Sequence, residues 1–581
     1  MSKLKNLKAT SNLLDVADLL GFKSKALAYI LYKKPVSERY KSFEILKSSG
    51  DMRPINAPSP ALKLLQKRLS TLLQDCIKEI NVIKNVKTTL SHGFKRKYSI
   101  ITNANVHRNK RYVFNIDLIN FFGEINFGRV RGFFILNRNF ELEPDVATIL
   151  AQIACHNNQL PQGSPSSPVI SNLIGHLLDI RLAKLAKYVS CTYSRYADDL
   201  TFSTNRRDFP SEVAINTGTN THSWKAGKKL EKIIDRSGFS INESKTRMQY
   251  MNSRQDVTGL IVNRKINTRS EYRHTARAMV YRLINTGKFQ IKIFSFDDDD
   301  KKVDSFIDGS LQQLNGILSF IDSVSVYNRK KDMNLSNRDK LTKPPDKPDC
   351  NEKVYQSFLL YKNFYAPSKP VILCEGKTDN IYLKAAIQSM EKDYPKLMEK
   401  KDDGKLGLGI CFIKRNATTG RMLGLEGGSG ELINIIKMYK MERIKFKAPV
   451  KRQPIIILVD NDDGFNGLFG YITNVTKSKV DKNAEFFHVF DNLYVVATPL
   501  TPNGKNTSIE DFFTDNLKKT TLSGKVFNPI FKTFNDKIHY GKNHFAKYVV
   551  WKNRKTVDLV GFKPLLTRIE DVLIDFGKRS P

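Results

Sequence analysis

The chain contains few cysteines, and none of them are paired in sequence. Its 581 residues include six, namely Cys76, Cys155, Cys191, Cys350, Cys374 and Cys411. Because no two of them form a CxxC pair, the sequence indicates neither a zinc site nor a disulfide framework. Such usage is typical of a reducing compartment, so we expect a cytoplasmic protein.

Long apolar runs are missing as well. No stretch approaches the roughly 18 apolar residues that a bilayer-spanning helix needs. The first five residues, Met1-Ser2-Lys3-Leu4-Lys5, lack the apolar run of a signal peptide. We therefore expect no membrane partner.

Acidic residues are a minority among the charged ones. The chain has 58 Asp and Glu against 95 Lys and Arg, a net charge of +37. This excess favours a nucleic-acid partner, because neutralised phosphates release counterions. On charge alone, a soluble basic protein with a solvated surface remains an alternative. The length predicts more than one domain, and 40% hydrophobic residues is ordinary for globular domains.

A first set of acidic residues lies at the ends of predicted strands. Asp117 follows the apolar segment 112–116, while Asp198 and Asp199 lie between predicted strands 191–196 and 200–203. On adjacent strands of one sheet, these carboxylates would hold two divalent metals for nucleotide polymerisation. An Asp-Asp turn that only hydrogen-bonds its own backbone is the alternative.

The residues around this set resemble a reverse transcriptase. Tyr196-Ala197-Asp198-Asp199 is similar to the catalytic hairpin motif of that family, and Asp117 to its first catalytic aspartate. The resemblance implies Mg²⁺ at Asp117, Asp198 and Asp199, and deoxynucleoside triphosphates as substrates. It also implies nucleotide or primer contacts for Arg53, Arg96, Phe122, Gln162, Gly163 and Lys245.

Two short segments resemble the retron branch of that family. Residues 103–107, Asn-Ala-Asn-Val-His, are similar to its NAxxH signature, and Val257-Thr258-Gly259 to its VTG signature. The resemblance implies RNA contacts for Asn103, His107, Thr258 and Gly259, although His107 as a satisfied core histidine stays open. It further implies a bacterial enzyme that copies its own structured non-coding RNA. Synthesis would begin at a guanosine 2′-hydroxyl and leave a branched RNA–DNA molecule, msDNA.

A second set of acidic residues follows two other apolar segments. Glu375 comes after 371–374, and Asp460 and Asp462 come after 455–459. Ligands bind at the carboxyl edge of parallel sheets, so these carboxylates should meet there. Their mutual repulsion implies a cation, and we expect Mg²⁺. Asp379 would join them or simply cap the helix that it begins.

These segments resemble a TOPRIM domain of the overcoming-lysogenization-defect (OLD) nuclease type. The similarity is carried by Glu375-Gly376-Lys377-Thr378-Asp379 and by Ser508-Ile509-Glu510-Asp511. It implies a nuclease with Glu375, Asp460 and Asp462 as catalytic residues. The implied metal ligands are Glu375, Asp379, Asp460, Asp462 and Glu510. The nucleic-acid substrate stays open between DNA, RNA and tRNA.

We therefore predict a multidomain protein of α+β and α/β class. Fingers and palm of a right-hand polymerase would span 1–260, and a helical thumb with a polar connector 261–366. A TOPRIM domain with a mostly parallel sheet would span 367–515, with its C-terminal extension at 516–581. Because a polymerase and a nuclease would lie on one chain, we expect the RNA–DNA product of synthesis to control cleavage by the nuclease. The resemblance also implies a role in anti-phage defence.

Two other functions stay open. The second domain of a reverse transcriptase could only bind nucleic acid or mediate assembly, or the chain could be a group II intron-like maturase. The retron-like segments and the lack of a zinc cluster or an HNH-like segment disfavour the maturase. The oligomeric state is not determined, and a homo-oligomer is allowed.

Overall fold

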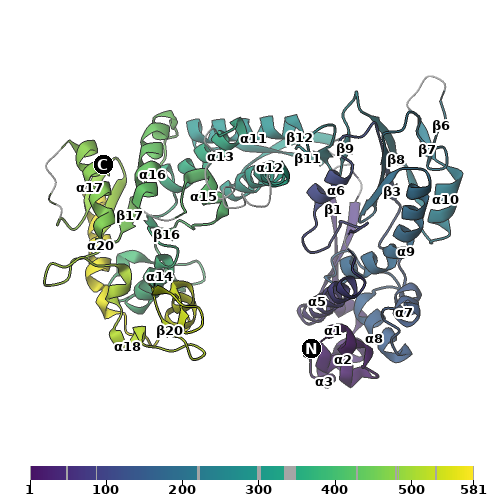
Figure 1. Ribbon diagram of the computed structural model, residues 1–581, viewed down its shortest axis with the longest axis horizontal. Coiled ribbons are helices and arrows are strands. Elements are labelled where there is room, and N and C mark those ends of the chain that lie inside the picture. The colour runs from purple at the N-terminus through teal and green to yellow at the C-terminus, as the bar shows by residue number, and fades with distance from the viewer. Residues whose placement is uncertain are drawn as a thin grey trace. The chain divides into compact units, whose positions relative to one another are not determined.

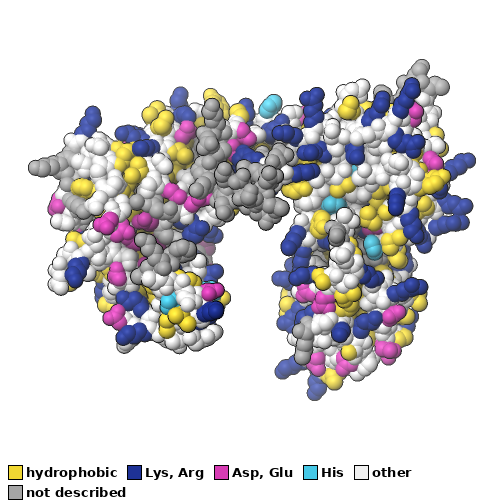
Figure 2. Space-filling model, viewed as in Figure 1, with side chains coloured by type: hydrophobic (Ala, Val, Ile, Leu, Met, Phe, Trp, Pro, Cys, Tyr) yellow, Lys and Arg dark blue, Asp and Glu magenta, His cyan; other side chains and the backbone are white. Residues whose placement is uncertain are grey.

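The computed structural model divides into two units (Figure 1). It describes residues 2–46, 50, 52–86, 88–218, 223–296, 302–332, 348–426, 429–477, 481, 483–529 and 533–579. The first unit is Met1–Ser270 with Phe294–Ser305, and the second is Glu271–Ile293 with Phe306–Pro581. No helix in the described ranges combines the length and apolarity that a membrane crossing requires. Figure 2 shows Lys and Arg side chains on the visible surface of both units.

The first unit begins with short helices and a hairpin. These are α1 (Lys3–Lys8), α2 (Leu13–Leu19), α3 (Ser24–Ala28), α4 (Val36–Arg39), β1 (Tyr40–Leu46) and β2 (Met52–Pro58). The long helix α5 (Pro60–Ile83) starts with proline at its first turn, where the missing N–H costs nothing. Its buried Leu62, Leu65, Leu69 and Leu73 recur at helical spacing and face one core.

An antiparallel sheet forms the centre of the first unit. Its strands are β3 (Tyr112–Leu118), β4 (Thr192–Tyr196), β5 (Asp199–Thr204) and β8 (Ile241–Tyr250), in the order β4-β5-β3-β8. Helices α6 (Ile100–Val106), α7 (Phe127–Leu136), α8 (Pro144–Ala154), α9 (Ser167–Tyr188) and α10 (Lys228–Asp235) accompany it. Small hairpins pair β6 (Ala214–Asn216) with β7 (Trp224–Ala226), and β9 (Asp256–Val257) with β10 (Leu260–Ile261).

The second unit contains most of the segment expected to form a thumb. Helices α11 (Ser270–Thr286), α12 (Leu311–Asp332) and α13 (Cys350–Leu360) accompany the hairpin of β11 (Gln290–Phe296) and β12 (Lys302–Asp308). Leu318 of α12 and Phe358 of α13 lie in one hydrophobic cluster with Val371 and Leu432 farther along the chain. These helices thus share a core with the α/β part. Of the expected thumb and polar connector at 261–366, residues 297–301 and 333–347 lie outside the described residues.

A sheet of β16-β13-β17-β19-β18 lies at the centre of the α/β part. The strands are β13 (Val371–Cys374), β16 (Cys411–Phe412), β17 (Ile455–Val459), β18 (Phe487–Phe490) and β19 (Leu493–Ala497). All neighbouring pairs are parallel except β18 with β19. Side chains alternate between two cores, with Ile455 and Ile457 in one and Ile456 and Leu458 in the other. Burial of both faces explains the uninterrupted apolar run of β17.

Helices cover both faces of this sheet. One core includes residues of α16 (Ser429–Glu442) and α17 (Asp463–Thr476), and the other includes residues of α14 (Asp379–Ser389) and α20 (Lys563–Arg579). Further strands and α-helices are β14 (Met398–Lys400), β15 (Leu406–Leu408), α15 (Ala417–Leu423), α18 (Asp515–Lys518), β20 (Val526–Phe527), β21 (His539–Tyr540) and α19 (Lys542–His544). Because α20 packs on the sheet, the C-terminal segment is part of this fold.

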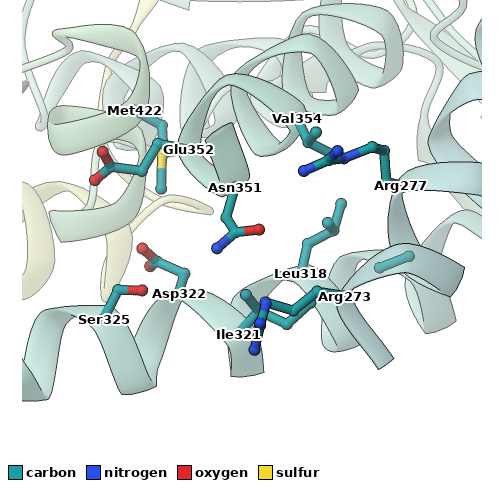
Figure 3. A pocket seen from close by; sticks show the side chains of 11 residues that line it. Arg273, Arg277, Leu318, Ile321, Asp322, Ser325, Asn351, Glu352, Val354 and Met422 are labelled. Carbon is teal, nitrogen blue, oxygen red and sulfur yellow. The ribbon is translucent and has the colours of Figure 1, made fainter. Parts of the chain in front are cut away.

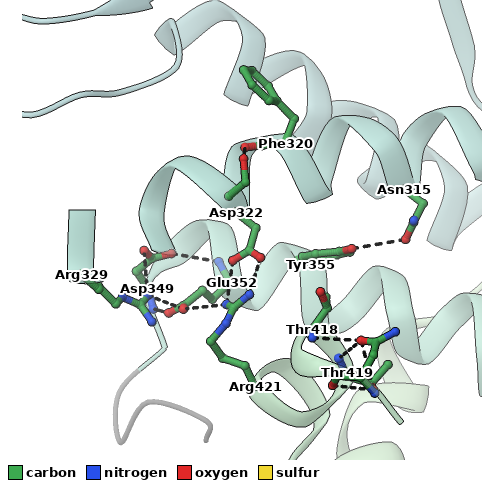
Figure 4. A network of polar contacts seen from close by, with 12 residues as sticks. Asn315, Phe320, Asp322, Arg329, Asp349, Glu352, Tyr355, Thr418, Thr419 and Arg421 are labelled. Atoms are coloured by element: carbon green, nitrogen blue, oxygen red, sulfur yellow. Dashed lines mark hydrogen bonds and ion pairs between the residues drawn. The ribbon is translucent and has the colours of Figure 1, made fainter. Parts of the chain in front are cut away.

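A buried ion network joins α12, α13 and α15 (Figure 4). The Arg421 guanidinium donates to both carboxylate oxygens of Asp322, one at 2.7 Å, and lies 3.7 Å from Glu352. Glu352 also pairs with Arg329. A pocket beside the network is lined by Arg273 and Arg277, among others (Figure 3). The network therefore connects the expected thumb helices to the α/β part through charged groups.

We expect Arg421→Met to destabilise the second unit by about 3–5 kcal/mol, because it leaves the Asp322 carboxylate buried without its partner. Arg421→Met with Asp322→Leu should recover most of that loss. Hydrogen-exchange protection of α12 and α15 measures the effect. Lys518→Met breaks a surface pair with Asp515 (3.2 Å) and serves as the control, at about 0–1 kcal/mol. Equal loss of protection in the two single variants would contradict the assignment.

Candidate active sites

The first carboxylate cluster is built by the register of β3 against β5. Antiparallel pairing places Asp117 opposite Asp199, and the backbone N–H of Leu118 donates to the Asp198 carbonyl at 3.1 Å. Ala197 in the β4–β5 turn has a φ of 56°, in the left-handed region. The register thus brings together all three aspartates that the sequence predicts for this site.

Electrostatics at this cluster favour a bound cation. Desolvation by the surrounding protein raises the pKa of Asp199 to about 6, helped by repulsion from Asp198 and Asp117. Lys245 places its Nζ 3.0 and 3.2 Å from the two carboxylate oxygens of Asp117, and Asn242 Nδ2 donates to one of them at 3.2 Å. Lys245, predicted to lie near a primer end, therefore contacts the Asp117 carboxylate directly.

The donor chemistry of the cluster fits Mg²⁺, which prefers carboxylate oxygens. Within the described part of the chain, no three His, Cys, Asp or Glu side chains are already arranged as a metal-binding group. The mutual repulsion of the three aspartates nevertheless fits a divalent ion. Binding it at Asp117 requires that carboxylate to exchange its contact with Lys245 for the ion.

The predicted nucleotide-binding loop lies against the β1–β2 hairpin. The backbone N–H of Asn56 donates to the Gln162 carbonyl at 2.8 Å. Gly163 has a φ of 114°, and a Cβ there would lie 2.7 Å from the Asn56 carbonyl oxygen, so only glycine fits. Burial raises the pKa of Asp198, and the charge of Arg53 on β2 opposes that rise. The β1–β2 hairpin thus brings Arg53 close enough to interact electrostatically with the aspartate cluster.

Aromatic rings lie beside the β4–β5 turn. The Phe122 ring centroid is 6.2 Å from that of Phe94, which is 6.4 Å from that of Tyr196. Arg96, predicted to contact nucleotide or template, pairs with Asp75 of α5 at 2.6 Å and is exposed. The sequence predicts no role for Phe94, which precedes Arg96 by two residues.

Asn103 and His107 are fully buried, and direct RNA contact does not fit them. The two ring nitrogens of His107 lie 2.7 Å from Ser203 Oγ and 2.7 Å from Ser194 Oγ, and Asn103 accepts from Ser194 at 2.7 Å. Burial lowers the pKa of His107 to about 3, so the ring is neutral. These residues brace β4 and β5, which is the core role left open for His107.

Thr258 and Gly259 form the turn between β9 and β10. Both have positive φ, 48° and 81°, and Thr258 Oγ1 donates to the Ile100 carbonyl of α6 at 3.3 Å. Gly259 is exposed and a Cβ there would meet no other atom within 4 Å. The turn therefore leaves surface at which the predicted RNA contact can be tested.

Comparison with known proteins agrees with this geometry. The family model described as "Reverse transcriptase (RNA-dependent DNA polymerase)" matches residues 45–272. The Retron Ec86 reverse transcriptase of Escherichia coli is 30% identical over 48% of this chain and 81% of its own length. The chain belongs to the retron reverse transcriptase family.

Two Myxococcus xanthus relatives match this retron-family chain over a smaller share of their own length. The Retron Mx65 reverse transcriptase is 33% identical over 46% of the chain and 62% of its own length. The Retron Mx162 reverse transcriptase is 31% identical over 43% of the chain and 52% of its own length. The chain thus spans less than two thirds of these relatives. The family model ends at residue 272, before the second carboxylate cluster.

This retron-family chain carries its second carboxylate cluster at the carboxyl ends of β13 and β17. The backbone N–H of Asp460 donates to Glu375 Oε2 at 3.3 Å, and Ile509 N–H donates to Asp460 Oδ1 at 2.9 Å. Asp379 accepts from Gly376 N–H at 2.7 Å. Parallel pairing of the two strands therefore brings Glu375 and Asp460 together as the sequence analysis expects.

Glu510 and Asp462 occupy different parts of this cluster. Glu510 is buried and lies 3.0 Å from Lys542 Nζ. Lys542 is thus a counter-ion of the site. Asp462 is exposed at the start of α17, where it accepts from Gly464 N–H at 2.8 Å. Four carboxylates therefore form the centre of the cluster, and Asp462 lies at its rim.

Arg415 is a buried cation at this site that sequence reasoning missed. Its Nε donates to the carbonyl of Cys374 at 2.9 Å, directly before Glu375. The positive charge opposes the increase that burial produces in the pKa of both Glu375 and Asp379. A single arginine after the two-residue strand β16 carries no signal of this role, because the contact depends on the sheet order.

The pKa of Asp460 rises to about 7 because of burial first, and then the charges of Asp379, Glu510 and Glu375. The folded state therefore binds a proton that the unfolded chain does not bind between about pH 4 and 7. In EDTA, we therefore expect protonation of Asp460 to raise the stability of the second unit by about 1 kcal/mol as the pH falls from 7 to 6.

Thermal unfolding in EDTA at pH 6, 7 and 8 checks this expectation, with the parent chain compared to Asp460→Asn. The asparagine variant should lack that part of the pH dependence, and saturating Mg²⁺ should reduce it in the parent. Identical pH profiles for parent and variant in EDTA would contradict the raised pKa.

Proposed function

We propose that this chain is the RNA-directed DNA polymerase of a retron, fused to a Mg²⁺-dependent nuclease. The observation that carries the polymerase is the β3–β5 register, which sets Asp117 opposite Asp199 beside Asp198. This register lies inside the part of the chain that matches the reverse transcriptase family model.

In the polymerase, Asp117, Asp198 and Asp199 would hold Mg²⁺. When bound, Mg²⁺ lowers the pKa of the primer hydroxyl and neutralises charge on the triphosphate. The primer hydroxyl loses its proton to solvent and its oxygen forms a bond to the α-phosphorus of the nucleotide, while the bond from that phosphorus to the pyrophosphate oxygen breaks and pyrophosphate leaves. Arg53 binds the triphosphate, the Gln162–Gly163 loop borders the nucleotide, and Phe122 packs against its sugar. Lys245, released from Asp117, contacts the primer end.

The proposed template is the chain's own structured non-coding RNA. Membership of the retron family and the net charge of +37 support this choice. Synthesis from a guanosine 2′-hydroxyl would yield branched msDNA. Thr258 and Gly259 are the proposed RNA contacts, and the reaction would take place in the bacterial cytoplasm.

The second unit is proposed to be a TOPRIM nuclease of the OLD type. Support comes from Glu375, Asp379, Asp460 and Glu510, which meet at the carboxyl edge of the sheet with Asp462 at the rim. Repulsion among these carboxylates costs free energy, and a domain that only bound nucleic acid would have no use for such a cluster. Gating of the nuclease by the RNA–DNA product would serve anti-phage defence.

Sequencing of the nucleic acid that copurifies with the chain tests the proposal. The parent should carry a small RNA covalently extended by DNA, and Asp198→Ala with Asp199→Ala should carry the RNA alone. RNA without DNA in both samples would overturn retron synthesis.

A further inference from the structure

Arg195 and Asp179 form a fully buried ion pair behind the polymerase cluster. Arg195 lies on β4 and Asp179 on α9, and each side chain has 0% exposure. Arg195 Nε and Nη2 donate to the two carboxylate oxygens of Asp179 at 2.7 and 2.8 Å. Tyr193 donates its hydroxyl to Asp179 at 2.8 Å. This bidentate contact fixes the plane and position of the guanidinium.

The remaining nitrogen of Arg195 reaches the catalytic turn. Nη1 donates to the carbonyl oxygen of Ala197 at 3.0 Å, directly before Asp198. Ala197 is left-handed, with a φ of 56°, which is unfavourable for a residue that has a Cβ. A hydrogen bond to the carbonyl of that residue holds the peptide that carries Asp198 in place.

The surroundings leave the turn little room to adjust. A Cβ at Gly93 would lie 2.7 Å from the Ala197 nitrogen, so the two backbones are in close contact. The His92 N–H donates to the Arg195 carbonyl at 2.8 Å, and the Arg195 N–H donates to the Leu90 carbonyl at 2.8 Å. Backbone contacts therefore hold β4 itself, whereas the Arg195 side chain holds the turn beyond it.

A purely structural role explains this pair poorly. Buried ion pairs are often no more stabilising than well-packed apolar residues, and their best-attested use is to specify one arrangement. Here the third nitrogen of the guanidinium donates to the carbonyl of the turn at 3.0 Å, whereas Asn172 Oδ1 of α9 lies farther from it, at 3.4 Å. Lysine could not replace it, because an ammonium on a flexible stem lacks the planar fork.

We propose that Arg195, oriented by Asp179, is a positioning residue that holds the Ala197 peptide so that Asp198 and Asp199 meet Asp117. This inference rests on the proposed polymerase function. It predicts a loss in the chemical step that exceeds any loss in nucleotide binding.

Steady-state DNA synthesis by the full chain on a primed homopolymeric RNA tests this inference. Arg195→Lys should lower kcat by about 100-fold through misplacement of the aspartates, with the KM for the nucleotide changed less than about threefold. Adding Ala197→Gly to that variant should recover about tenfold in kcat, since glycine adopts the left-handed φ without steric cost. Arg68→Lys is the matched control, because Arg68 Nη1 donates to the Leu20 carbonyl at 2.9 Å and holds a different loop.

A second variant covers the case in which Arg195→Lys does not fold. Arg195→Met with Asp179→Leu removes both buried charges and should fold, yet lose kcat to a similar extent. Full kcat in either folded variant, a loss matched by Arg68→Lys, or no recovery by Ala197→Gly would overturn the inference. A parent chain that extends no primer would count against the polymerase function itself.

Discussion

Asp198→Asn lowers kcat for DNA synthesis by about 1000-fold, the largest effect that we expect for a single substitution in the first unit. Asparagine keeps the shape of the side chain but removes the negative charge that the cluster supplies to Mg²⁺. Because Asp198 and Asp117 both raise the pKa of Asp199, their charges act together in the same small volume. Nucleotide incorporation on a primed RNA template with Mg²⁺ measures the loss.

Asp208→Asn is the control for that experiment. Asp208 is exposed in the same unit, so its substitution should leave kcat within about twofold of the parent. Asp198→Asn with undiminished synthesis would mean that the β3–β5 cluster is not the polymerase centre.

We expect Asp460→Ala with Asp462→Ala to remove most of the cleavage that we propose for the second unit and, with it, the proposed phage restriction. The Asp460 carboxylate accepts a hydrogen bond from the Ile509 N–H, and the Asp460 N–H donates to Glu375. Loss of the Asp460 carboxylate therefore removes the centre of the second cluster. Cleavage should fall by about 1000-fold as the metal ligands are lost. DNA synthesis should persist within about twofold, because Asp117, Asp198 and Asp199 belong to the first unit and Asp460 and Asp462 to the second.

Plaque counts and msDNA yield from the same cells measure both effects. Asp515→Asn is the matched control, since Asp515 is an exposed residue that pairs with Lys518 at 3.2 Å on the surface. Intact restriction in the double variant would instead support a second domain that only binds nucleic acid or mediates assembly.

Local pattern was enough to predict strands and the carboxylates that end them. The apolar run 455–459 predicts a buried strand, and β17 has these bounds. Asp117 follows an apolar segment, and Asp198–Asp199 interrupts two others, so a hairpin beside a strand was expected. These inferences succeed because strand period and turn composition are properties of adjacent residues.

Only the tertiary structure decided which distant side chains support each site. The partners of His107 lie 87 and 96 residues away, and burial among them replaces the RNA contact expected from the motif. Likewise, Arg195 meets Asp179, and Lys542 meets Glu510, through the packing of whole elements. Sequence alone determined which residues carry charge and where strands end. The fold determined which charged side chains lie together in a low-dielectric interior. Such proximity depends on strand register and sheet order, which no local sequence pattern encodes.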